Sequence, residues 1–140
     1  MSNKTNWLNS NVFAIDYCLC MTEQEAKNAF EEYGLLDEAR FIDGDRADAT
    51  VHMLDRGFNS AYIVCLKNMF DRDDIEVFGL LTHEAVHIVD DVFDKMDETQ
   101  PGKEVRAYMT QTLSMVLQQE YLDRKQEQTA NPFKASVWTN

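Results

Sequence analysis

The stretch SAYIVCLK, residues 60–67, indicates the class of fold, because it is apolar on both of its alternating faces. One face carries Ala61, Ile63 and Cys65, and the other carries Tyr62, Val64 and Leu66. A strand with two apolar faces is covered by other elements on both sides. The preceding run ATVHML, residues 49–54, is also β-prone, and the intervening DRGFN is typical of a turn. We therefore predict an antiparallel hairpin whose second strand is sandwiched between other elements.

Three helices are predicted around this hairpin. Thr22 and Glu25 form a capping-box pattern at the start of the first helix, and Gly34 is a typical stop. Asp73 and Asp74 are good N-cap types for a second helix, which runs through the stretch HEAVH, and Glu76 completes a box-like pattern for Asp73. Pro101 suits the first position of a long last helix, which continues through EVRAYMTQTLSMVLQQEYLDR.

The chain is expected to form one domain, residues 1–125, followed by a polar tail, residues 126–140. Its 140 residues are 44% hydrophobic, which is enough to bury a single core. The tail is polar apart from its end, and Phe133 or Trp138 can dock it on the domain. For the β-prone run NVFAIDYCLC, residues 11–20, both a strand and irregular packing remain open.

The composition argues against two kinds of partner. The net charge of −12 disfavours nucleic acid, because binding to a phosphate backbone depends on Lys and Arg. No apolar run approaches the roughly 18 residues that a membrane span needs. The start MSNKTNWLNSNVF also lacks the basic and apolar segments of a signal peptide. We expect a cytoplasmic protein that binds neither nucleic acid nor membrane.

The three cysteines fit a reducing compartment, because they are odd in number and form no CxxC pair. The pair Cys18 and Cys20 can in principle supply two sulfur ligands from one face of a strand. The commoner outcome for such residues is a small, buried, apolar side chain. We therefore expect reduced thiols.

The stretch LLTHEAVHIVDD, residues 80–91, contains the candidate site, because His83 and His87 are four positions apart with Glu84 after the first. Residues i and i+4 of a helix lie about 6 Å apart along the axis and about 40° apart around it. Two imidazoles on one face can therefore hold one Zn²⁺ ion. Glu84 can act as general base on a water molecule at that ion. The alternative is an ordinary amphipathic helix with two solvated or core histidines.

A catalytic zinc site typically has three protein ligands, so a third ligand is required. The continuation HExxHxxGxxH is absent, because Asp90 and Phe93 occupy its last two fixed positions. The acidic candidates downstream are Asp90, Asp91, Asp94, Asp97, Glu98 and Glu104. One helix can hardly wrap three ligands around a tetrahedral ion, which favours Glu104 at the start of the last helix. The alternative for Glu104 is an acid that is favoured by the helix dipole.

The position of Glu104 sets a geometric condition. If the motif helix continues to Met96, it carries the chain about 13 Å beyond His87. Either the helix stops near Asp91, or the stretch DKMDETQPGK folds back along it. Ten residues span up to about 33 Å, so the length of the connection is sufficient.

Tyr108 lies one turn beyond Glu104 and can point its hydroxyl at a developing oxyanion. The alternative for Tyr108 is a packed aromatic residue with a hydrated tip. Weaker candidates for the same role are Tyr62, Arg106 and His52. The apolar strand near the motif helix also suggests pairing with a substrate peptide, although burial as a core strand is the simpler interpretation.

The stretches HEAVH and EVRAY resemble those of zincin-like metallopeptidases of the gluzincin kind. The predicted order of helix, hairpin, motif helix and ligand helix resembles the ImmA/IrrE and SprT-like groups. LLTHEAVHIVDD followed by PGKEVRAYMTQ is similar to small HExxH proteins of tailed bacteriophages, and the resemblance covers residues 22–122. It implies a minimal zincin-like α+β fold, in which a small antiparallel sheet packs against the HExxH helix and a closing C-terminal helix.

The resemblance implies a zinc-dependent peptidase or amidase that acts on a protein or peptide in the host cytoplasm. His83, His87 and Glu104 would bind Zn²⁺, Glu84 would be the base, and Tyr108 would assist. The chain departs from SprT-like proteins in having no basic or zinc-ribbon region, and it leaves little room for the repressor-binding region of ImmA-like proteins. One alternative is a catalytically idle, zinc-stabilised protein that binds a host or virion partner. A metal-free structural protein is the other.

Overall fold

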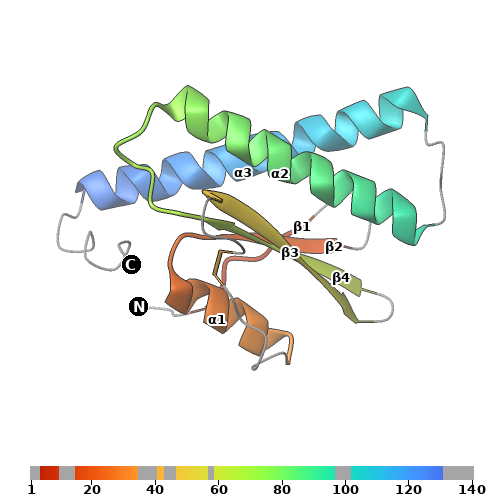
Figure 1. Ribbon diagram of the computed structural model, residues 1–140, viewed down its shortest axis with the longest axis horizontal. Coiled ribbons are helices and arrows are strands. Elements are labelled where there is room, and N and C mark those ends of the chain that lie inside the picture. The colour runs from red at the N-terminus through yellow and green to blue at the C-terminus, as the bar shows by residue number, and fades with distance from the viewer. Residues whose placement is uncertain are drawn as a thin grey trace.

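The computed structural model describes residues 4–9, 15–34, 41–42, 47–56, 59–96 and 102–130. Its strands are β1 (Leu8–Asn9), β2 (Ile15–Cys20), β3 (Ala49–Arg56) and β4 (Asn59–Leu66), and its helices are α1 (Glu23–Glu32), α2 (Asp74–Lys95) and α3 (Lys103–Ala130). The strands form one sheet in the order β1-β2-β4-β3. Helix α1 lies on one face of the sheet, and α2 and α3 lie side by side on the other (Figure 1). The fold is therefore α+β, as the sequence predicts.

The sheet is mixed, so the prediction of a purely antiparallel sheet is wrong. β3 and β4 pair antiparallel, which confirms the hairpin, and β1 pairs antiparallel with β2. β2 and β4 are parallel, with Ile15 opposite Ser60 and Cys20 opposite Cys65. After β2 the chain passes through α1 and re-enters the sheet at its edge as β3, which runs opposite to β2. Its hairpin partner β4 reverses direction again and is therefore parallel to β2. The segment 15–20, for which the sequence left two possibilities, is thus a strand.

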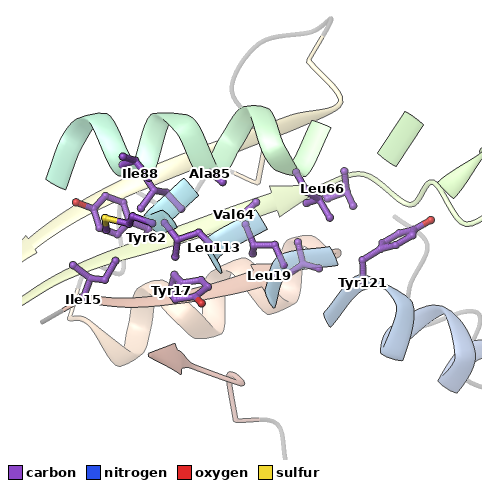
Figure 2. Packing of buried hydrophobic residues seen from close by; sticks show 14 of the residues in the cluster. Ile15, Tyr17, Leu19, Tyr62, Val64, Leu66, Ala85, Ile88, Leu113 and Tyr121 are labelled. Carbon is purple, nitrogen blue, oxygen red and sulfur yellow. The ribbon is translucent and has the colours of Figure 1, made fainter. Parts of the chain in front are cut away.

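The central strand β4 is buried on both faces. Tyr62, Val64 and Leu66 belong to the apolar cluster beneath α2 and α3, whereas Ala61, Ile63 and Cys65 belong to the cluster beneath α1. Figure 2 shows the first cluster, in which Tyr62 and Val64 lie between the sheet and Ala85 and Ile88 of α2. Each large apolar side chain buried in this way contributes about 1.5–3 kcal/mol. The two helical layers are therefore held on the sheet through this strand.

Both ends of α1 follow from local sequence signals. The Thr22 hydroxyl accepts a hydrogen bond from the Glu25 amide at 3.1 Å, which confirms the predicted N-cap. The Glu25 carboxylate accepts from the Met21 amide at 2.9 Å, one residue before the usual partner in a capping box. Gly34 adopts a φ of 76°, a conformation that favours glycine and ends the helix.

Helix α3 folds back antiparallel to α2. Arg106 pairs with Asp90 near the connection, and the Gln118 amide donates to the Thr82 hydroxyl at 3.3 Å further along. Helix α2 thus continues past Asp91 to Lys95, so the first of the two predicted geometries, a stop near Asp91, is wrong, whereas residues 97–101 of the stretch DKMDETQPGK lie outside the described residues. Helix α3 extends beyond the predicted domain boundary at 125, and residues 131–140 lie outside the described part. Within the described residues, no helix has the length and apolar character needed to cross a membrane.

A partly buried ion pair joins the two helical layers beyond the end of the sheet. Arg124 of α3 contacts Glu25 at the start of α1 and Glu120 one turn earlier, and its side chain is only 13% exposed. Burial raises the pKa of Glu25, and the neighbouring Arg124 counteracts that rise. If Arg124 were removed, the Glu25 carboxylate would remain in a poorly hydrated position without its cation.

We expect Arg124→Ala to lower the free energy of unfolding by about 2–4 kcal/mol, because it leaves a partly buried carboxylate without its cation. The matched control is Arg72→Ala, which removes an exposed pair with Glu76 and should cost less than about 1 kcal/mol. Urea unfolding at neutral pH measures both. Equal losses for the two variants would contradict a structural role for the Arg124–Glu25 pair.

Candidate metal centre

His83 and His87 project together from the exposed face of α2. Their Nε2 atoms are 3.1 Å apart, and their ring centroids are separated by 4.8 Å at an interplanar angle of 77°. The i, i+4 spacing places them on one face, as the sequence predicts. The structure thus confirms that the two imidazoles converge.

The separation of the two rings fits a single zinc ion. Two ligand nitrogens at about 2.05 Å from a tetrahedral ion are about 3.3 Å apart. The observed Nε2–Nε2 distance of 3.1 Å is close to that value. Without an ion, one Nε2 can donate its hydrogen to the other, which requires that the accepting ring be neutral at that atom. Chelation of one ion requires both Nε2 atoms to be deprotonated, and their separation is that of a chelating pair.

Glu84 lies between this exposed pair and the core. Successive helix residues are rotated by about 100°, so Glu84 turns from the face of His83 toward the sheet. Its side chain is 6% exposed, and burial raises its pKa, while His83 and His87 act to lower it. Among the described residues, no group donates a hydrogen bond to its carboxylate. A poorly hydrated carboxylate that binds protons more readily than usual has the property required of a general base.

Glu104, the predicted third ligand, lies apart from the pair. It occupies the first turn of α3 and is exposed. The contacts Arg106–Asp90 and Gln118–Thr82 set the antiparallel register of the two helices and place Glu104 further along α2 than His87, toward the connection between the helices. In the part of the chain that the structure describes, no three His, Cys, Asp or Glu side chains are grouped closely enough to hold a metal ion. The structure therefore brings together His83, Glu84 and His87, but not Glu104.

The proposed oxyanion donor, Tyr108, is 64% exposed on α3 and does not belong to the packed core. The weaker candidates each have other contacts. His52 lies on the opposite face of the sheet, where its Nε2 is 3.2 Å from the Phe41 carbonyl oxygen. Arg106 pairs with Asp90. Since the histidine pair lies on α2, on the other face of the sheet, the sheet separates His52 from the pair.

A polar network next to the pair was not predicted from the sequence. The Tyr62 hydroxyl donates to Asp91 at 2.7 Å, and the Lys95 ammonium lies 3.0 Å from the same carboxylate. Burial and the Asp91 charge raise the pKa of Tyr62, so its hydroxyl remains protonated and can donate. Asp91 is one turn after His87, and Lys95 one turn after Asp91, so the i, i+4 spacing was the available signal. This network fixes α2 to β4 directly beside the histidines.

The three cysteines are free thiols and are all buried, which confirms the expectation of reduced, small core residues. The Sγ atoms of Cys18 and Cys20 are 3.9 Å apart beneath α1. β4 has a hydrogen-bonded strand on each side, so the suggested pairing of a peptide with β4 is wrong. Among the described strands, β3 forms the edge of the sheet on the side of α2.

Comparisons with known proteins give no relative for this chain. No family model, no curated protein and no solved structure matches it. The interpretation of the histidine pair and Glu84 therefore depends on their geometry and chemistry alone.

We expect Glu84→Gln to stabilise the metal-free protein near neutral pH. The native state holds the Glu84 proton more tightly than the unfolded chain, so stability falls as the pH rises through the raised pKa. Glutamine avoids this cost, and its advantage should vanish as the pH falls below the ordinary carboxyl pKa of about 4.3. Urea unfolding with a chelator, at several pH values, measures the difference. The exposed Glu31→Gln serves as control, and an identical pH profile for both variants would contradict the burial of Glu84.

Proposed function

We propose that the protein is a zinc-dependent hydrolase of peptide or amide bonds, with His83 and His87 as zinc ligands and Glu84 as general base. The observation that supports this function is the Nε2–Nε2 distance of 3.1 Å beside a buried carboxylate. A chance pair of surface histidines has no need of a buried glutamate next to it to which no described group donates a hydrogen bond. Such a glutamate costs folding free energy, which a catalytic role would explain.

The chemistry divides between the ion and the chain. When bound, zinc supplies a Lewis acid that lowers the pKa of water and polarises a carbonyl group. The Glu84 carboxylate would accept the proton of the attacking water and pass it to the leaving amine. Its low hydration raises its proton affinity, which suits both transfers. His83 and His87 would hold their Nε2 lone pairs toward the ion throughout.

Glu104 remains our proposed third ligand and Tyr108 the proposed donor to the oxyanion. Both side chains are exposed on the first turns of α3, one turn apart, so they share a face. Ligation by Glu104 requires these turns to approach His87, because the register places them further along α2. The substrate we propose is a protein or peptide, which could pair with β3, since β3 is an edge strand of the sheet among the described strands.

The exposure of the pair supports a second candidate function. Two histidines without a third protein ligand can bind zinc and leave the remaining positions to water or to a partner. In this form the protein would be a catalytically idle, zinc-stabilised module that binds a host or virion protein. The separation of Glu104 from the pair favours this candidate.

The first prediction for this site concerns zinc content. We expect His83→Ala or His87→Ala to weaken zinc binding more than about 100-fold, since each removes a direct ligand. His52→Ala is the matched control, because the third histidine of the chain lies on the opposite face of the sheet and should leave binding unchanged. Elemental analysis and titration with a zinc indicator measure both quantities. Equal zinc contents in all variants would exclude the pair as the binding site.

The second prediction separates the two candidate functions. For an enzyme, Glu84→Gln should keep zinc and lose at least about 100-fold in hydrolysis, because proton transfer typically supplies a factor of 10²–10⁴. Cleavage of a peptide library prepared from digested cell lysate, followed by mass spectrometry, measures the loss. Unchanged cleavage in Glu84→Gln would reject Glu84 as the base. Zinc binding without any cleavage by the unaltered protein would favour the idle module.

A further inference from the structure

A hollow lies away from the histidine pair, at the carboxyl ends of the parallel strands β2 and β4. Its volume is about 610 Å³, and its apolar lining includes Met21, Phe41, Ile42 and Phe70. Met21 directly follows β2, and Phe70 lies in the loop that follows β4. Lys67, Asp71 and Gln128 also line the hollow. Apolar hollows of this size are favourable sites for aromatic side chains.

The last turns of α3 are held next to this cavity. The Tyr121 hydroxyl donates to the Met69 carbonyl at 3.1 Å, and the Tyr121 and Phe70 rings lie 5.5 Å apart. One turn further along, Lys125 pairs with Asp74 at 2.7 Å. Gln128 itself lines the cavity, and α3 ends at Ala130. The chain therefore leaves α3 at the edge of the hollow.

The ten residues that follow have a composition suited to the cavity. The segment 131–140, NPFKASVWTN, contains Phe133, Val137 and Trp138. Phe133 is only five residues beyond Gln128, and ten residues span up to about 33 Å. Reach and apolar character thus both favour contact with the hollow.

We propose that the segment 131–140 folds back onto this cavity and inserts its aromatic side chains between Ile42 and Phe70. A tethered segment is present at a high effective concentration, which favours it over a free ligand. A second copy of the chain would bring another net charge of −12, and mutual repulsion opposes its approach. The occupant is therefore the C-terminal segment of the same molecule.

Tryptophan fluorescence tests this proposal, because the chain contains only Trp7 and Trp138. In the full-length Trp7→Phe variant, all tryptophan emission comes from Trp138. We expect emission at shorter wavelength than in the urea-unfolded chain, and protection from acrylamide. Adding Ile42→Asp should abolish both effects, whereas the control Val105→Asp, at an exposed site on the first turn of α3, should leave them. Circular dichroism establishes that each variant is folded.

Three outcomes would overturn the proposal. In the first, Trp138 of the folded Trp7→Phe protein emits and is quenched as in urea. In the second, its protection depends on protein concentration, which would assign the cavity to another copy. In the third, Val105→Asp exposes Trp138 as much as Ile42→Asp does.

A second measurement decides the matter even if Ile42→Asp fails to fold. The full-length variant Trp138→Ala changes a residue outside the described core and should uncover the cavity. We expect it to bind the apolar dye anilinonaphthalene sulfonate several-fold more strongly than the unaltered protein. No increase in dye binding would count against the segment as the occupant.

Discussion

Burial of β4 on both faces is the constraint on which the other features depend. Its alternating side chains require one layer of helices above the sheet and another below it. Helix α2 meets this requirement with an apolar stripe that includes Leu81, Ala85 and Ile88. Once that stripe faces the sheet, the rotation of α2 about its own axis is fixed. His83 and His87 must then point outward, because the helical period allows no other direction.

The same rotation gives Glu84 its unusual environment. Its position on α2 lies at the boundary between the apolar stripe and the exposed face, so its carboxyl group is buried while the two imidazoles stay hydrated. Burial opposes ionisation of Glu84, and the nearby histidines favour it. If Glu84 stood at another angle around the helix, its carboxylate would be exposed. If the histidines did, their imidazoles would be buried. The packing of the core therefore sets the electrostatics of the candidate site.

The antiparallel pairing of α2 and α3 has both a structural and a chemical consequence. It directs α3 back along the sheet, so that Arg124 near the end of α3 contacts Glu25 of α1. This contact links the two helical layers at the end of the sheet. It also places the first turn of α3 beyond the histidine pair, so Glu104 stands further along α2. A shorter α2 would bring the two closer, but it would lose the Tyr62–Asp91 contact that holds α2 on β4.

The sequence by itself determined the features that depend on neighbours within about four residues. The caps at Thr22 and Asp73, the stop at Gly34 and the convergence of His83 with His87 are all of this kind, because helix geometry relates such residues directly. Only the tertiary structure decided the parallel pairing of β2 with β4, the burial of Glu84 and the position of Glu104 along α2 relative to the histidine pair. It also decided the Arg124–Glu25 contact across 99 residues. These depend on how distant segments pack, and no local period or spacing encodes that arrangement.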